Sequence, residues 1–401
     1  MKILQLTTKV PYPPKDGGAA GIFVFSKVLQ ELGHSVAILA FNPPKHFISR
    51  LALSDLPPSL QIHMVEIDTK PSWYKALTNL IFKTIPYQVE RFANQKFEGK
   101  LLELLVQFDP DVVQLEGVYL CPYIEKIRAH SKARIVLRAH NIEYMLWQNI
   151  SENEPNLIKR VYLAIQAKRV KRFEVAQFSN VDGVTTVTQH DLSVVEMHHP
   201  ITKMRAIPFG IEIKPKPNRV KYNTEAISFI GALDWMPNQE AMLWFIRSVW
   251  PLLQHNYPSL QFHIAGRNAP MHLKSLIEQQ PGVIFHGEVN DSTEFLNQFS
   301  IIIVPLFAGS GIRVKIIEAM DHGLVVIASA KAVEGIPAIS GQHLLIANTP
   351  EDFLNEITRV FGDTSLMDKL SANAMAFVRE NFDILVIGSE LIDFYNQISN
   401  D

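Results

Sequence analysis

The chain has 401 residues, a length that favours two domains because a single hydrophobic core rarely grows beyond roughly 250–300 residues. Hydrophobic residues make up 47% and charged residues 19%, which excludes a disordered or fibrous protein. The formal net charge of −2 gives no indication of a nucleic-acid partner. The single cysteine, Cys121, excludes an intramolecular disulfide and favours a reducing compartment. No apolar run is long enough for a signal-peptide core or a membrane span, so we expect a cytoplasmic protein.

In the first half of the chain, short Val/Ile/Leu runs alternate with longer amphipathic segments such as Ala20–Leu32. Near-continuous apolar runs are typical of strands buried on both faces of a parallel sheet, and parallel strands need helical crossovers. This alternation predicts an α/β domain. The predicted strands are Ile3–Leu6, Val36–Ala40, Ile62–Val65, Val112–Leu115, Ile135–Arg138 and Gly183–Val187.

A glycine pair, Gly17-Gly18, follows the first predicted strand and precedes a helical pattern that starts near Ala19. Glycines allow close backbone approach, and the free N–H groups of a helix start attract an anion. The pair therefore indicates either a phosphate contact or a simple turn. His140 follows the strand Ile135–Arg138, a place that suits an active-site residue as well as a structural hydrogen-bonding histidine.

Two segments in the first half combine apolar and basic residues. The first runs from Trp73 to Phe92, and the second, Lys159–Arg172, carries six Lys and Arg side chains. Basic amphipathic helices lie on anionic lipid, so peripheral contact with the inner face of a membrane stands beside the alternative of a solvated helix face. The stretch Asp109-Pro110-Asp111 has the form of a metal-binding D-x-D, but its turn-forming sequence ahead of a strand predicts a turn, and we expect no metal site.

The strand–helix alternation restarts near residue 225, after a segment rich in Pro, Gly and charge. We therefore predict a domain at 1–207, a linker at 208–224, a second Rossmann-like domain at 225–382 and a last helix at 383–401 that could cross back to the first domain. Predicted helices of the second half include Gln239–Gln254, Arg313–His322 and Leu385–Ile398. Its predicted strands are Ile227–Ile230, Gln261–Ala265, Val283–Phe285, Ile301–Val304, Val325–Ala328 and Leu344–Ile346.

The segment Gly309–Gly323 carries the strongest functional signal. Gly309 and Gly311 follow a strand and precede a helix, which is where open α/β sheets bind ligands. Arg313 and Lys315 in the first turn could neutralise a diphosphate, and Glu318 one turn on could accept hydrogen bonds from ribose hydroxyls. The alternative is a packed helix with a Lys315–Glu318 surface pair.

At these motifs the chain resembles the GT4-type retaining glycosyltransferases, which have the GT-B fold of two Rossmann-like domains facing each other across a cleft. The resemblance covers nearly the whole chain, and its most specific part is the last of the motifs that carry it. These are Asp16–Gly18 with Gly33–Val36, Arg138–Glu143, Ile207–Ile211, Phe229–Gly231 and Gly309–Met320.

The resemblance implies roles for residues in both halves. Glu318 would hold the donor ribose, Gly17 and Gly18 would close over the donor, and His140 would lie near the reacting sugar as the catalytic candidate. The sequence departs from the family at Ser310, where the family has a glutamate, and in the loop after Gly231, which lacks the usual Arg and Lys. The remaining candidates for binding the donor are Gly231, Arg267, Gly311, Arg313 and Lys315.

The resemblance implies transfer of a sugar from a nucleoside diphosphate sugar to a saccharide or lipid-linked acceptor, with retention of configuration, in cell-surface polysaccharide or glycolipid synthesis. The basic residues and the helix N-terminus would stabilise the leaving diphosphate without a metal or cofactor. Two alternatives stay open at this point. One is a nucleotide-sugar 2-epimerase of the same fold, and the other is a non-catalytic module that binds sugar or nucleotide.

Overall fold

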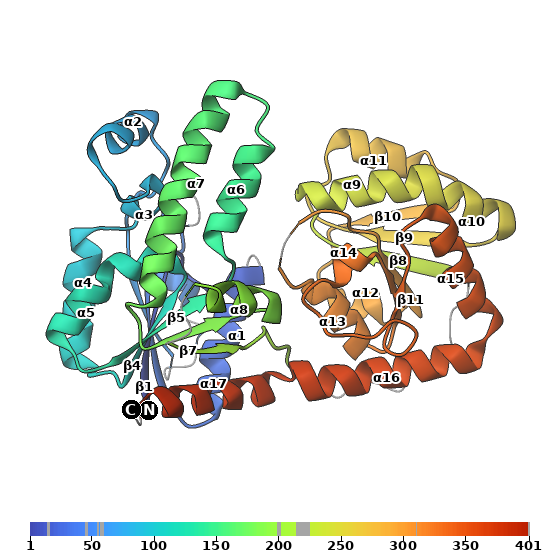
Figure 1. Cartoon of the computed structure of the whole chain (residues 1–401). Helices are drawn as coiled ribbons and strands as arrows, with labels where there is room; N and C mark the ends of the chain where they lie inside the picture. Colours follow the sequence, from blue (N-terminus) through green and yellow to red (C-terminus); the bar gives the residue numbers. More distant parts are fainter. Residues whose placement is uncertain are drawn as a thin grey trace. The chain divides into compact units, whose positions relative to one another are not determined.

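The computed structural model describes residues 1–13, 17–44, 47–53, 56, 60–198, 202–213, 225–309 and 311–399. The chain divides into two compact units, one of residues 1–210 with 384–401 and the other of residues 211–383. Both are α/β units built on a parallel sheet, as expected from the alternating apolar runs (Figure 1). Most of the predicted linker, residues 214–224, lies outside the described residues, and so do Asp16 and Ser310.

The sheet of the first unit has the strand order β3-β2-β1-β4-β5-β6-β7 in its described residues. Its apolar strands coincide with the predicted ones. The edge strand β7 was not predicted, because it pairs only with β6 and is half-buried, so its sequence Lys-Met-Arg-Ala has no apolar run. The strands are β1 (Lys2–Thr7), β2 (Ser35–Phe41), β3 (Gln61–Val65), β4 (Val112–Glu116), β5 (Arg134–Ala139), β6 (Gly183–Thr186) and β7 (Lys203–Ala206).

Helices cover both faces of this sheet, because successive strand residues point to opposite sides. Ile3 of β1 packs into a core with helices α1 and α17, whereas Leu4 and Leu6 pack into a second core with α4, α5, α7 and α8. The helices are α1 (Gly17–Glu31), α2 (Trp73–Phe82), α3 (Tyr87–Glu90), α4 (Gln95–Gln107), α5 (Ile124–His130), α6 (Glu143–Glu152), α7 (Leu157–Phe178), α8 (Gln189–Glu196) and α17 (Ile384–Ser399), with 3-10 turns η2 (Arg50–Leu53) and η3 (Val118–Tyr123).

The sheet of the second unit has the order β10-β9-β8-β11-β12-β13 in the residues that the structure describes. All six strands had been predicted from apolar runs. They are β8 (Ala226–Ile230), β9 (Gln261–Ala265), β10 (Val283–Gly287), β11 (Ile301–Val304), β12 (Val325–Ala328) and β13 (Leu345–Ile346).

The helix predicted as Gln239–Gln254 is wrong as a single helix. It is divided into α9 (Met236–Trp244), a π-helical turn η4 (Phe245–Val249) and α10 (Trp250–Asn256). Pro251 near the start of α10 has no N–H to donate to the preceding turn, and the wider turn accommodates that loss. The other helices are α11 (Met271–Glu278), α12 (Ser292–Leu296), α13 (Val314–Asp321), α14 (Ala330–Val333), α15 (Pro350–Gly362) and α16 (Thr364–Phe382).

Candidate functional site

The strand order of the second unit places two loops at its topological switch point, where successive strands begin to be added on the other side of the sheet. β8 and β11 are neighbours, and the strands that follow them lie on opposite sides, β9 beyond β8 and β12 beyond β11. Ligands of open α/β sheets bind at the carboxyl ends of such a strand pair. Gly231 follows β8, and the loop with Gly309 and Gly311 follows β11. The structure thus brings these sequence-predicted glycines to one edge of the sheet.

Lys315 in the first turn of α13 reaches back to the end of β8. Its Nζ donates a hydrogen bond to Asn238 Oδ1 at 2.9 Å and lies 4.4 Å from the centroid of the Phe229 ring. A Cβ atom at Gly231 would lie 2.5 Å from this Nζ, so glycine is the residue that leaves room for the ammonium. The residue as a whole is half-buried, but its charged end is enclosed by protein.

This enclosure changes the protonation of Lys315. Burial lowers its pKa, the nearby charge of Arg313 lowers it further, and Glu318 raises it, so that the pKa falls to about 7. The lysine is therefore not the exposed partner of a surface ion pair. It is a cation held at the carboxyl ends of β8 and β11. A bound anion would offset the free-energy cost of burying its charge.

Arg313 is the N-cap residue of α13 and is only 5% exposed. Its guanidinium lies 5.8 Å from the centroid of the Trp235 ring, and its Nη1 donates to the Gly311 carbonyl oxygen. Burial lowers its pKa, against a smaller opposing effect of Glu334. Two cations thus share the amino-terminal end of α13, where the helix dipole already favours negative charge.

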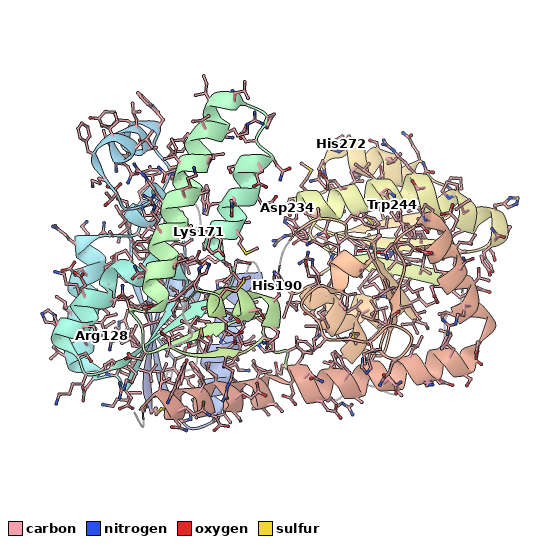
Figure 2. All side chains as sticks on the ribbon, in the orientation of Figure 1. Arg128, Lys171, His190, Asp234, Trp244 and His272 are labelled. Atoms are coloured by element: carbon pink, nitrogen blue, oxygen red, sulfur yellow. The ribbon has the colours of Figure 1, made fainter. Side chains whose placement is uncertain are left out.

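The two glycines of this loop have backbone conformations that suit their residue type. Gly309 has φ of 96° and Gly311 has φ of 80°, both in the left-handed region. A Cβ atom at Gly309 would lie 2.9 Å from the Trp235 ring, so the loops after β8 and β11 pack directly on each other. Asp234, labelled in Figure 2, precedes this tryptophan in the chain, and its Oδ2 accepts a hydrogen bond from Asn268 Nδ2 at 3.0 Å.

The remaining predicted residues lie in different places. Glu318 is half-buried on α13, one turn after Lys315. Arg267 follows β9, and its carbonyl oxygen accepts from the N–H of Leu233 at 2.9 Å, which holds the loop after β8. Gly17 and Gly18 form the start of α1 in the first unit.

His140 follows β5 in the first unit, and the structure pairs it with a carboxylate that the sequence analysis missed. Its Nε2 lies 2.6 Å from Glu116 Oε2 at the end of the neighbouring strand β4. The carboxylate is buried, whereas 19% of the His140 side chain is exposed. Because an ionised carboxylate only accepts hydrogen bonds, Nε2 carries the proton of this hydrogen bond, and in the neutral form of the ring Nδ1 is then the acceptor.

Glu116 is held charged by its surroundings. Burial raises its pKa. The hydrogen bond from His140, the charge of His140 in its protonated form, the charge of Arg138 and a hydrogen bond from Gln114 Nε2 outweigh burial and lower the pKa below its usual value. The same glutamine accepts a hydrogen bond from the hydroxyl of Tyr395 on α17. The His140–Glu116 pair is therefore anchored through the sheet to the last helix of the chain.

Arg138 supplies the positive charge beside this pair. Its guanidinium carbon lies 3.8 Å from the centroid of the Phe25 ring on α1 and 5.2 Å from that of Phe209. Burial lowers the pKa of Arg138, and Glu116 raises it. Its Nη1 and Nη2 are buried and make no hydrogen bond within the described part of the chain, so ring faces and the carboxylate charge are what hold the cation.

Glu116, Asn238 and Trp235 are the residues of these sites that sequence reasoning missed. Glu116 ends the strand Val-Val-Gln-Leu-Glu, and a charged residue there was a usable signal, because strand carboxyl ends carry ligand sites. Asn238 and Trp235 gave no such signal, since their roles depend on distant residues that fold back onto them. Asn238 meets Lys315, 77 positions later, and Trp235 meets Arg313.

Residues 224–363, which hold Gly231 and the Arg313–Glu318 stretch, match the family model described as "Glycosyl transferases group 1". The matched range contains the switch-point glycines and both buried cations. A protein of Klebsiella pneumoniae described as "Uncharacterized 44.6 kDa protein in cps region" is 22% identical over 401 residues, covering 95% of this chain and 96% of that protein. The similarity to the group 1 glycosyl transferases thus lies within the second unit.

Solved structures with the same architecture cover nearly the whole chain. Sucrose-phosphate synthase from Thermosynechococcus elongatus has a TM-score of 0.70 at 16% identity, covering 99% of both chains. The HepE protein of Anabaena, in complex with UDP, has a TM-score of 0.67 at 14% identity, covering 99% of this chain and 100% of its own. TarM of S. aureus, in complex with UDP among other ligands, has a TM-score of 0.68 at 12% identity, covering 99% of this chain and 100% of its own. The chain has the GT-B fold.

Proposed function

We propose that this protein is a glycosyltransferase that moves a sugar from a nucleoside diphosphate sugar to an acceptor hydroxyl with retention of anomeric configuration. The observation that carries the proposal is the pair of buried cations, Arg313 and Lys315, at the carboxyl ends of β8 and β11. Two like charges in a desolvated place repel each other, and a diphosphate carrying two negative charges relieves both the repulsion and the burial cost.

The same groups have a direct role in the reaction. The bond between the anomeric carbon and the diphosphate oxygen breaks, the acceptor oxygen forms the new bond to that carbon, and the diphosphate leaves with the electron pair. Arg313, Lys315 and the amino-terminal end of α13 stabilise the charge that develops on the leaving oxygen. Glu318 accepts hydrogen bonds from the ribose hydroxyls and fixes the nucleoside. Electrostatic stabilisation by these residues is the proposed source of catalysis, without a cofactor.

In the first unit we propose that His140 contacts the reacting sugar and that Glu116 positions it. The 2.6 Å hydrogen bond fixes one tautomer of the ring, with Nδ1 as acceptor. A fixed ring orientation matters because catalytic groups lose much of their effect when they are misplaced by about 1 Å. Gly17 and Gly18 at the start of α1 are proposed to contact the donor phosphates through their N–H groups.

The comparisons supply the biological setting of the proposal. The Klebsiella relative carries the words "in cps region", and several solved relatives are described in complex with UDP, UDP-glucose or a glycerol-linked sugar. We accordingly propose a UDP-type or related donor and a saccharide or lipid-linked acceptor, in the synthesis of a cell-surface polysaccharide or glycolipid.

The test is a panel of UDP-, GDP- and ADP-sugars, scored for binding and for transfer or hydrolysis, with product configuration read by NMR. Replacing Glu318 by Ala removes hydrogen bonds to a charged group, each worth about 1.5–3 kcal/mol, so nucleotide affinity should fall at least about tenfold. Exposed Glu240 on α9 provides a matched control, because Glu240→Ala should bind as the wild type does. Unchanged affinity in Glu318→Ala would refute the ribose assignment. Conversion of the donor without any acceptor product would instead identify an epimerase.

A further inference from the structure

Helix α2 of the first unit exposes large apolar side chains that globular proteins normally bury. Trp73, Leu77 and Ile81 follow i, i+4, i+8 spacing and share one face, with Tyr74 beside them. Trp73 is 81% exposed and Ile81 is 63% exposed. A contiguous apolar surface of this kind marks an interaction site rather than scattered exposure.

The amino-terminal half of α7 repeats this pattern. Leu157, Val161 and Ile165 again follow i, i+4, i+8 spacing, and Ile158, next to the first of them, is 85% exposed. The helix begins at the Asn156 cap, whose side chain accepts the N–H of Lys159 at 3.0 Å. Two helices of the same unit thus present apolar stripes with the same spacing.

The two helices are held together as one surface. Arg169 on α7 donates through Nη2 to the Leu80 carbonyl oxygen at 2.8 Å and through Nη1 to that of Asn79 at 3.2 Å, at the carboxyl-terminal end of α2. Gln166 donates to Asn79 Oδ1 at 3.4 Å. Figure 1 shows α2 beside α7. The exposed stripe of α2 is therefore anchored to a long helix and is not a loose segment.

Positive charge predominates on this surface, although Lys83 pairs with Glu90 and Lys159 pairs with Glu154. Residues 69–89 contain three lysines and no acidic residue, and residues 157–173 contain six Lys and Arg and no acidic residue. An open pocket of about 430 Å³ lies where the end of α2 meets α7, lined by Thr84, Ile85, Arg169, Arg172 and Phe173. Arg172 makes no hydrogen bond or ion pair within the described residues, so its guanidinium is available to an anion.

We propose that α2 and the amino-terminal half of α7, here called the α2–α7 surface, dock on an anionic lipid bilayer, with the Arg169–Arg172 pocket receiving the phosphate of a lipid headgroup. Trp and Tyr favour the membrane interface because their rings have an apolar body and a polar tip. Apolar stripes flanked mainly by basic residues fit an anionic interface. None of the described helices has the length and apolar character needed to cross a bilayer.

This inference does not depend on sugar transfer, so it can fail or succeed separately from the proposed function. The first experiment is sedimentation with vesicles of equal parts phosphatidylcholine and phosphatidylglycerol, compared with phosphatidylcholine alone. We expect the protein to pellet with the anionic vesicles and to be released by salt, which screens surface charge. Arg172→Ala should weaken binding about fivefold, the value of one basic side chain at an anionic surface. Lys132→Ala, an exposed lysine outside the surface, is the matched control.

The apolar half of the surface is tested by Trp73→Glu with Ile158→Glu, which should reduce vesicle binding by more than about tenfold. Met271→Glu, equally exposed but in the second unit, is the control. Dibrominated lipid should quench the fluorescence of Trp73, and Trp73→Phe should keep binding but lose that part of the quenching. An unchanged circular dichroism spectrum and thermal unfolding temperature in each variant verify folding.

Three results would overturn the proposal: a protein that stays in the supernatant at low salt, variants of the α2–α7 surface that bind like the wild type, or a protein dimer that Trp73→Glu converts to monomer without any lipid binding. The last result would assign the surface to a second copy of the chain. If soluble glycerol phosphate displaces the protein from vesicles as effectively as the anionic lipid itself does, the pocket binds a free phosphate ligand instead of a lipid headgroup.

Discussion

Replacing Lys315 by methionine removes a buried ammonium and keeps a side chain of similar length. In the wild-type protein, burial and the charge of Arg313 lower the pKa of Lys315 to about 7, against the opposing effect of Glu318. Below pH 7 both the folded and the unfolded chain carry this charge, and the folded state bears the full cost of enclosing it. We therefore expect Lys315→Met to be more stable than the wild type, which is unusual for a change at a buried position.

The magnitude follows from the pKa. The difference between the usual 10.5 and about 7 corresponds to roughly 5 kcal/mol, at 1.36 kcal/mol for each pKa unit. The variant also loses the 2.9 Å hydrogen bond to Asn238 and leaves its oxygen without that donor, which costs about 1–3 kcal/mol. The net expected gain is about 2–4 kcal/mol near pH 6.

The gain depends on pH with a defined sign. Between about pH 7 and 10.5 the unfolded wild-type chain binds a proton that the folded protein does not, so wild-type stability rises with pH in this window. Lys315→Met has no such proton. The advantage of the variant over the wild type should therefore be largest at or below pH 7 and should disappear as the pH approaches 10.5.

The assay is thermal and urea unfolding at about pH 6 and about pH 9, together with nucleotide affinity on the same samples. For a unit of this size each kcal/mol raises the unfolding temperature by about 2–4 °C. Lys274→Met is the matched control: this exposed lysine pairs with Glu278 on α11, and its loss should change stability by less than about 1 kcal/mol. The reasoning is refuted if Lys315→Met is less stable than the wild type at low pH, or if it binds nucleotide with unchanged affinity.

Three further predictions concern the two sites. Glu116→Gln should lower the transfer rate about 10- to 100-fold, because it removes one charge-assisted hydrogen bond that orients His140, and it should leave nucleotide affinity intact; equal losses in both would point to misfolding instead. Affinity for an intact nucleotide sugar, whose diphosphate does not titrate near neutrality, should be tightest below about pH 7 and weaker at about pH 9. Above about pH 7 Lys315 is mostly neutral, and part of the binding free energy is used to protonate it. An affinity that does not change between about pH 6 and about pH 9 contradicts this. Gly231→Ala should weaken nucleotide binding with little loss of stability, since its Cβ would lie 2.5 Å from the flexible end of Lys315, whereas Gly362→Ala has open space and should bind normally.

Much of the fold could be predicted from local sequence patterns. Parallel strands buried on both faces must be apolar along their length, so the inner strands of both sheets were predicted within a residue or two of their observed ends. The half-buried edge strand β7 and the division of the helix near Pro251 were missed, because neither leaves a continuous pattern. Glycines ahead of a helix start likewise indicated where the second unit has its switch-point loops.

What the sequence determined about function is the identity and order of the charged residues on α13, since i, i+3 spacing fixes which side chains a helix turn brings together. Only the tertiary structure decided what those residues meet. The pKa of Lys315 is about 7 because the protein buries its charged end, between Gly231 and Asn238, which lies 77 positions earlier in the chain. His140 has a defined tautomer because Glu116 comes from a neighbouring strand. Burial and charge neighbours set a pKa, and both are properties of contacts between segments that are distant in the chain.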